Sequence, residues 1–107
     1  GALKIGEAKP IFEGYSRLGI PEMRYRLGSA KVSQSVILHA GLSNGILKRG
    51  LQYSFKVTGA MDRVIFNLDS AQVLAESSAG NWSADKSSLS LSPQEARQFT
   101  ITLLPKN

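Results

Sequence analysis

Apolar and polar residues alternate along much of this chain, which is the pattern of β-strands that bury one face. The alternation is unbroken over residues 51–58 and resumes over residues 63–68, after a turn at 59–62. It directs seven side chains into a core: Leu51, Tyr53, Phe55, Val57, Val64, Phe66 and Leu68. Because the two runs are joined by a short turn, they are predicted to form a hairpin.

The C-terminal part of the chain has the same organisation. Leu89 and Leu91 alternate with serines, and the alternation returns over residues 98–103. Between these runs Pro93 marks a turn, since proline fixes φ and donates no backbone hydrogen bond. These two strands are predicted to form a second hairpin.

Shorter strands are expected elsewhere, at residues 2–5, 11–13, 24–27, 32–39 and 71–76. Residues 14–21 are expected to form a long connection, and residues 77–81 a loop. A turn is expected at residues 43–45, because Asn-Gly is a strong turn signal between alternating runs.

The elements together predict the fold class. Seven or eight short strands, with no sustained apolar stripe at helical spacing, indicate an all-β protein. The length of 107 residues suits one domain, spanning residues 1–107. One-sided apolar strands favour a two-sheet antiparallel sandwich. The alternative is a small barrel, which includes folds that bind nucleic acid.

A family resemblance lies in residues 82–103, which contain Leu89-Ser90-Leu91-Ser92-Pro93-Gln94-Glu95 ahead of an alternating strand. This segment resembles the last two strands of bacterial immunoglobulin-like modules, where Leu-x-Leu-x-Pro-Gly-Glu precedes the closing strand. Gln94 stands where that family usually has glycine. The resemblance implies an immunoglobulin-like sandwich that serves as a spacer, adhesion or accessory domain of a secreted, periplasmic or cell-surface protein.

The charge of the chain changes this picture little. The formal net charge is +5, with 13 basic residues, and a basic protein attracts nucleic acid, acidic glycans and anionic lipid. The basic residues are scattered, however, as is usual for solubility and for the protection of strand edges. We therefore do not expect nucleic acid as a partner, and a binder of polyanions is kept as a third hypothesis.

Candidate catalytic and metal-binding chemistry is sparse. The chain has no cysteine, and His39 is its only histidine, so neither a His/Cys metal site nor a thiol nucleophile is expected. No Gly-x-Ser-x-Gly motif and no phosphate-binding glycine loop occur. We therefore expect no enzyme activity, no catalytic residues, no metal and no cofactor. No apolar run approaches the ~20 residues of a membrane span.

Seven residues remain as candidates for binding. Trp82 follows a Gly-Asn loop, so its ring either stacks on a sugar or partner, or covers the core between the sheets. Tyr15 and Tyr25 are weaker candidates of the same kind. Arg24, Arg26, Lys48 and Arg49 form a basic patch if the fold brings them together, and are separate solvated charges if it does not.

Two hypotheses about function follow. The first is a non-catalytic extracytoplasmic module of a larger bacterial protein, which serves attachment, positioning, or the binding of a protein or carbohydrate partner. The second is a self-assembling structural subunit of a pilus, secretion apparatus or virion, whose copies associate through strand edges. In the second hypothesis the N-terminal segment is a candidate strand for donation to a neighbour.

Overall fold

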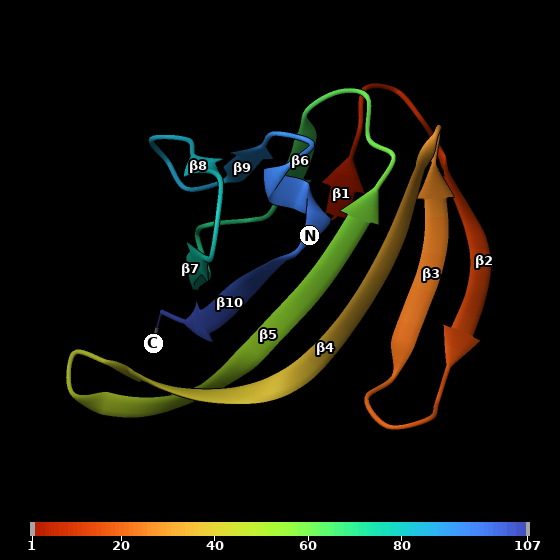
Figure 1. Ribbon diagram of the computed structural model, residues 1–107. Helices are drawn as coiled ribbons and strands as arrows, with labels where there is room; N and C mark the ends of the chain where they lie inside the picture. Colours follow the sequence, from red (N-terminus) through yellow and green to blue (C-terminus); the bar gives the residue numbers. More distant parts are fainter. Residues whose placement is uncertain (1, 107) are drawn as a thin grey trace.

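Two antiparallel sheets make up the structure, a computed structural model that describes residues 2–106. They pack as a sandwich (Figure 1). This confirms the predicted all-β class and the two-sheet antiparallel arrangement. The larger sheet has six strands in the order β2 (Pro10–Ser16), β3 (Glu22–Leu27), β4 (Ala30–Ser43), β5 (Ile46–Thr58), β10 (Phe99–Pro105) and β7 (Val73–Ser77).

The smaller sheet has four strands, and all of them are short. Their order is β1 (Ala2–Lys4), β6 (Val64–Asn67), β9 (Ser88–Leu91) and β8 (Asn81–Trp82). A single 3₁₀ turn, η1 (Glu95–Arg97), connects β9 to β10. Within residues 2–106 no helix is long and apolar enough to span a bilayer.

Both predicted hairpins are wrong. β5 pairs with β4 and β10, whereas β6 pairs with β1 and β9, so the turn after β5 carries the chain from one sheet to the other. The connection from β9 to β10 crosses between the sheets in the same way. Alternation specifies which side chains face the core but not which strands pair. Two strands in one sheet and two strands that face each other across the core show the same alternation.

Several predicted boundaries also differ from the structure. There are ten strands in the described chain, where seven or eight were expected. β2 extends to Ser16, so part of the expected connection at residues 14–21 is strand. The strand expected at residues 32–39 is longer in the structure, where β4 has fourteen residues. The predicted turn at residues 43–45 is confirmed, with positive φ angles of 52° at Asn44 and 76° at Gly45.

The core lies where the small sheet covers the large one. On the large sheet it is centred on Phe55, whose ring stacks on Phe99 at a centroid distance of 5.0 Å. From the small sheet, the Phe66 ring meets Phe55 edge-on at 5.9 Å. The other buried apolar residues are Leu3, Ile5, Tyr25, Leu27, Ala30, Val32, Val57, Val64, Leu89, Leu91, Ala96 and Ile101.

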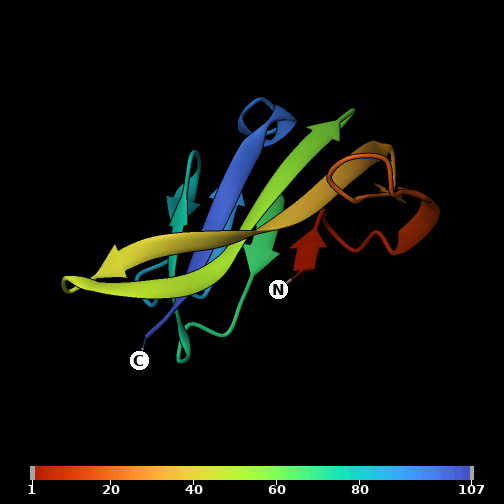
Figure 2. The ribbon, with the colours of Figure 1, turned by 90° about the horizontal axis from the view of Figure 1, so that it is seen from below.

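The hairpin of β4 and β5 reaches beyond the sandwich. Its strands pair without a break from Lys31–Thr58 to Ser43–Ile46, but β3 stops pairing with β4 at Ser35. Figures 1 and 2 show the outer half of this hairpin bending past the end of β10, where Gly41 and Gly50 lie beside Leu104. The radius of gyration is 14.0 Å, compared with about 13 Å for a compact domain of this length. We call residues 36–51 the hairpin extension.

Candidate functional site

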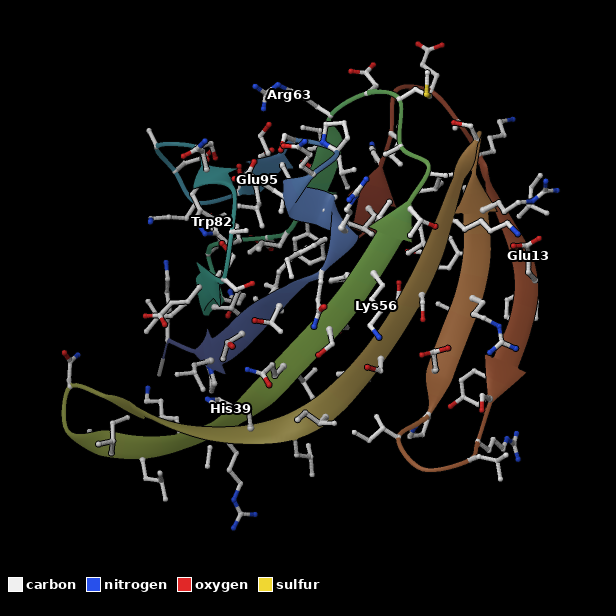
Figure 3. All side chains as sticks on the ribbon, viewed as in Figure 1. Glu13, His39, Lys56, Arg63, Trp82 and Glu95 are labelled. Atoms are coloured by element: carbon white, nitrogen blue, oxygen red, sulfur yellow. The ribbon has the colours of Figure 1, made fainter. Side chains whose placement is uncertain are left out.

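The charged side chains form no compact chemical centre. In the part of the chain that the structure describes, no three His, Asp or Glu side chains lie together as metal ligands would. His39 is half-buried on the outer face of the large sheet, the face turned away from the small sheet (Figure 3). It shares a hollow with Glu76 of β7 and Leu104 of β10, and the other lining residues are Gly41, Leu42, Leu74 and Thr102.

Trp82 lies on β8, at the edge of the small sheet (Figure 3). Its side chain is half-buried and packs against the core. This is the core-covering position considered for it in the sequence, and it leaves only part of the ring available to a ligand.

The two candidate tyrosines have different environments. Tyr25 is buried on β3, and its hydroxyl donates a hydrogen bond of 2.7 Å to the side-chain carbonyl of Gln34. Burial raises the pKa of Tyr25 to about 12. Tyr15 is about half exposed on β2, and the Arg17 guanidinium lies 5.8 Å from its ring centroid. Only Tyr15 is therefore accessible to a partner.

The four candidate basic residues do not form one patch. Arg24 aligns with Ser33 across β3 and β4, and Lys48 aligns with Gly41 across β4 and β5. Eight residues along β4 separate these two positions, or about 26 Å. Arg49, next to Lys48, belongs to the hairpin extension.

Arg24 and Arg26 instead lie near two lysines that are not among the candidates from the sequence. Lys31 pairs with Arg26 across the strands, and both Lys31 and Lys56 line a hollow beside Arg24 on the outer face. Carboxylates offset much of this charge. Arg24 forms an ion pair with Glu22 at 3.4 Å, and Arg26 forms one with Glu13 at 3.2 Å. This exposed surface therefore presents a weak field for a polyanion.

Glu95 has a structural role. Its carboxylate accepts the backbone N–H of Ser92 at 2.9 Å and that of Gly80 at 3.2 Å, while the Ser92 hydroxyl accepts the N–H of Glu95 at 3.1 Å. This reciprocal pair is a capping box, and it joins the loop before β8 to the connection between the sheets. The backbone N–H of Ser92 is the main reason that the pKa of Glu95 is lowered.

An uncovered apolar surface lies on the hairpin extension. By strand alternation, even-numbered residues of β4 and odd-numbered residues of β5 share the inner face, the face that holds Val32 and Phe55 in the core. Beyond the reach of the small sheet this face stays apolar but is exposed to solvent. Its exposed residues are Val36 (42%), Leu38 (85%), Leu42 (72%), Leu47 (66%) and Leu51 (37%).

A single charge interrupts this apolar face. Arg49 lies between Leu47 and Leu51 in the alternation of β5 and is exposed. Neither of the two ion pairs found among residues 2–106 involves Arg49. The surface is thus an apolar strip of leucine and valine with one cation.

The outer edge of β4 is also without a strand partner along this extension. Within the described chain, residues 36–43 pair with β5 on one side only. We call this segment the free edge of β4. It contains no charged residue and no proline, and its register with β5 has no bulge, so it lacks the usual features that protect strand edges.

The other exposed edges differ from it. β2 starts at Pro10, carries Glu13, and has a register shift between Phe12 and Gly14. β1 has three residues and β8 has two. At the other edge of the large sheet, β7 has five residues, one of which is Glu76. Short length, charge, proline and bulges all discourage strand addition. Among the exposed edges formed by residues 2–106, only the free edge of β4 has none of these features.

Sequence reasoning missed this surface although one signal was present. Apolar residues recur at every second position of residues 30–42 and 47–57, with only Gln34 and Arg49 breaking the series, and β4 and β5 are fourteen and thirteen residues long. Most strands have three to ten residues. Strands of this length cannot be covered by the strands of two to four residues that form the opposite sheet.

Comparisons of this chain with protein-family models, with curated proteins and with solved structures found no match.

Proposed function

We propose that this chain is a non-catalytic binding module: an extracytoplasmic, immunoglobulin-like β-sandwich domain that serves attachment or positioning within a larger bacterial protein. Its binding surface is the inner face of the hairpin extension, and its partner is a protein. The uncovered apolar face that includes Leu38, Leu42 and Leu47 carries this proposal. The placement outside the cytoplasm rests on the resemblance of residues 82–103 to bacterial immunoglobulin-like modules.

The exposed apolar side chains of the hairpin extension have a higher free energy in water than they would have against a partner. Burying a fully exposed leucine or valine gains about 1.5 to 3 kcal/mol. Five such side chains, between 37% and 85% exposed, represent on the order of 5 kcal/mol when a partner covers them, before the entropy of association is subtracted. Contiguous exposed apolar surface of this kind marks interaction sites.

A protein fits this surface better than a carbohydrate does. Sugar sites rely on aromatic rings that stack on the sugar and on polar groups that hydrogen-bond its hydroxyls. The apolar strip is aliphatic, and its only charged group is Arg49. Trp82, the ring best suited to stacking, is half-buried against the core. An aliphatic surface depleted of charge resembles the centre of a protein interface.

Site-specific photo-cross-linking in the organism that makes the protein tests this proposal. A photoreactive amino acid replaces Leu38, which is 85% exposed on the inner face of the extension. In the matched control it replaces Lys56, which is exposed on the outer face of β5 (Figure 3). We expect position 38 to cross-link to one defined polypeptide and position 56 not to do so. Equal labelling at both positions, or labelling of lipid alone, would refute the proposal.

The second candidate function is the self-assembling structural subunit. The observation that favours it is the free edge of β4, which is unprotected over eight residues. Donation of the N-terminal strand receives less support, because β1 pairs with β6 and the side chains of Leu3 and Ile5 are buried in the chain's own core.

A further inference from the structure

We infer that the free edge of β4 binds a second copy of this chain, with the two β4 strands antiparallel, so that the two six-stranded sheets become one. This inference goes beyond the proposed function, because it concerns the edge of the hairpin extension and leaves the inner face of both copies open to the proposed partner.

The two turns that flank β4 establish which backbone groups face outward. In a two-residue hairpin turn the flanking residues hydrogen-bond to each other. Ser43 therefore directs its N–H and C=O to Ile46 of β5, and Ala30 directs its own to Leu27 of β3. Since these groups alternate in direction along a strand, odd-numbered residues of β4 face β5 and even-numbered residues face the β3 side.

Beyond Ser35 there is no β3 strand to receive the even-numbered groups. The N–H and C=O groups of Val36, Leu38, Ala40 and Leu42 therefore point away from β5, into the space where another strand would lie. Four donors and four acceptors in a regular row form a template for strand addition.

The free edge is complementary to itself when the second strand runs antiparallel. It holds no charged side chain, so pairing brings no like charges into contact. On the other side of the same hairpin, residues 46–50 of β5 also form an edge. That edge does carry charge, because Lys48 and Arg49 lie in it. Arg49 pairs with Ala40 across the hairpin, so this charge lies one strand away from the pairing line in each copy.

The space beside β4 selects the register. A two-fold axis at His39 would place Ser43 of the partner strand opposite Ser35, a position where Glu22 already pairs. A two-fold axis at Ala40 places that Ser43 opposite Ile37 instead, clear of the end of the β3 pairing. We therefore infer the register centred on Ala40.

This register also joins the apolar strips of the two copies. On the inner face, Leu38 of each strand lies directly opposite Leu42 of the other, which is the spacing at which cross-strand apolar pairs stabilise a sheet. At the two-fold axis, Ala40 of one copy pairs with Ala40 of the other. Both N–H groups of the Ala40 pair are then hydrogen-bonded to the opposite strand.

Sedimentation velocity with the purified chain tests whether the dimer forms. We expect the monomer to convert to a dimer as the protein concentration is raised from about 1 to about 500 µM. Ala40→Pro should weaken the dimer by roughly tenfold or more, because it removes both hydrogen bonds of the central pair. Ala40→Val keeps the N–H and should dimerise like the natural chain. Leu38→Lys places two charges on the joined strip and should also weaken the dimer, which provides a second variant if Ala40→Pro does not fold.

Single cysteines test the register, because the chain has none of its own. In a dimer of the Ala40→Cys variant, the two introduced cysteines would have Cα atoms about 5.5 Å apart, a distance that a disulfide spans. The matched control is Ile37→Cys on the same strand, where the two cysteines would lie about 20 Å apart. We expect rapid oxidation to a covalent dimer at position 40 and none at position 37.

The results separate this inference from the proposed function. A chain that stays monomeric at every concentration, or a dimer indifferent to Ala40→Pro and Leu38→Lys, would overturn edge pairing. If such a monomer still cross-links through position 38 to a different polypeptide, the proposed function stands and the partner is not a second copy. A dimer that oxidises at position 37 in place of position 40 would refute the register.

Discussion

Replacement of Phe55 by alanine should remove much of the stability of the fold. The ring is 2% exposed, stacks on Phe99 and contacts Phe66 edge-on across the two sheets. Deleting a buried phenylalanine costs about 3 to 5 kcal/mol. Because the substitution also removes three aromatic pairs, with Tyr53, Phe66 and Phe99, we expect a loss at the upper end of this range, about 5 kcal/mol. Domains are stable by only about 5 to 15 kcal/mol, so the variant should be barely folded at room temperature.

The matched control is the same substitution at Phe12, which is 64% exposed on β2. We expect Phe12→Ala to cost less than about 1 kcal/mol, since little buried area is lost. The free energy of unfolding of both variants can be measured by urea unfolding, followed by the fluorescence of Trp82, the only tryptophan. Equal losses at the two positions, or a loss below about 1.5 kcal/mol for Phe55→Ala, would show that the contact between the sheets is not the centre of the core.

Three further outcomes are expected from particular residues. Stability should fall as pH rises from about 10 to about 12, because burial raises the pKa of Tyr25 to about 12 and its phenol ionises more readily in the unfolded chain; urea titrations should show no such fall in Tyr25→Phe. The pKa of Glu95 is held down, mainly by the backbone N–H of Ser92, so the stability it contributes is present above the usual glutamate pKa of about 4.3 and is lost as pH falls through its lowered value. Glu95→Gln should flatten this acid limb in the same titration. A Cβ at Gly50 would overlap a backbone carbonyl of β10, whereas at Gly14 it would meet only the flexible end of an arginine; thermal melts should therefore show a loss of more than about 2 kcal/mol for Gly50→Ala and a small change for Gly14→Ala.

The fold class could be predicted from the sequence because alternation is a local property. The inward positions of Phe55, Val57, Val64 and Phe66 were predicted, and all four are buried. The sheet to which each strand belongs could not be predicted in this way. The turn after Thr58 serves equally well for a hairpin or for a crossing between sheets, and here the partners of β5 lie on other segments of the chain.

The candidate site was beyond sequence reasoning for a related reason. Leu51 and Phe55 lie on the same face of β5 and have the same place in its alternation, four residues or about 13 Å apart. Leu51 is 37% exposed and Phe55 is 2% exposed. The difference arises from the opposite sheet, whose strands end before they reach Leu51. Alternation therefore shows which face of a strand avoids water, but not what covers that face. In this chain the alternation of β5 places Phe55 of the core on the same face as Leu47 and Leu51 of the surface proposed for a partner.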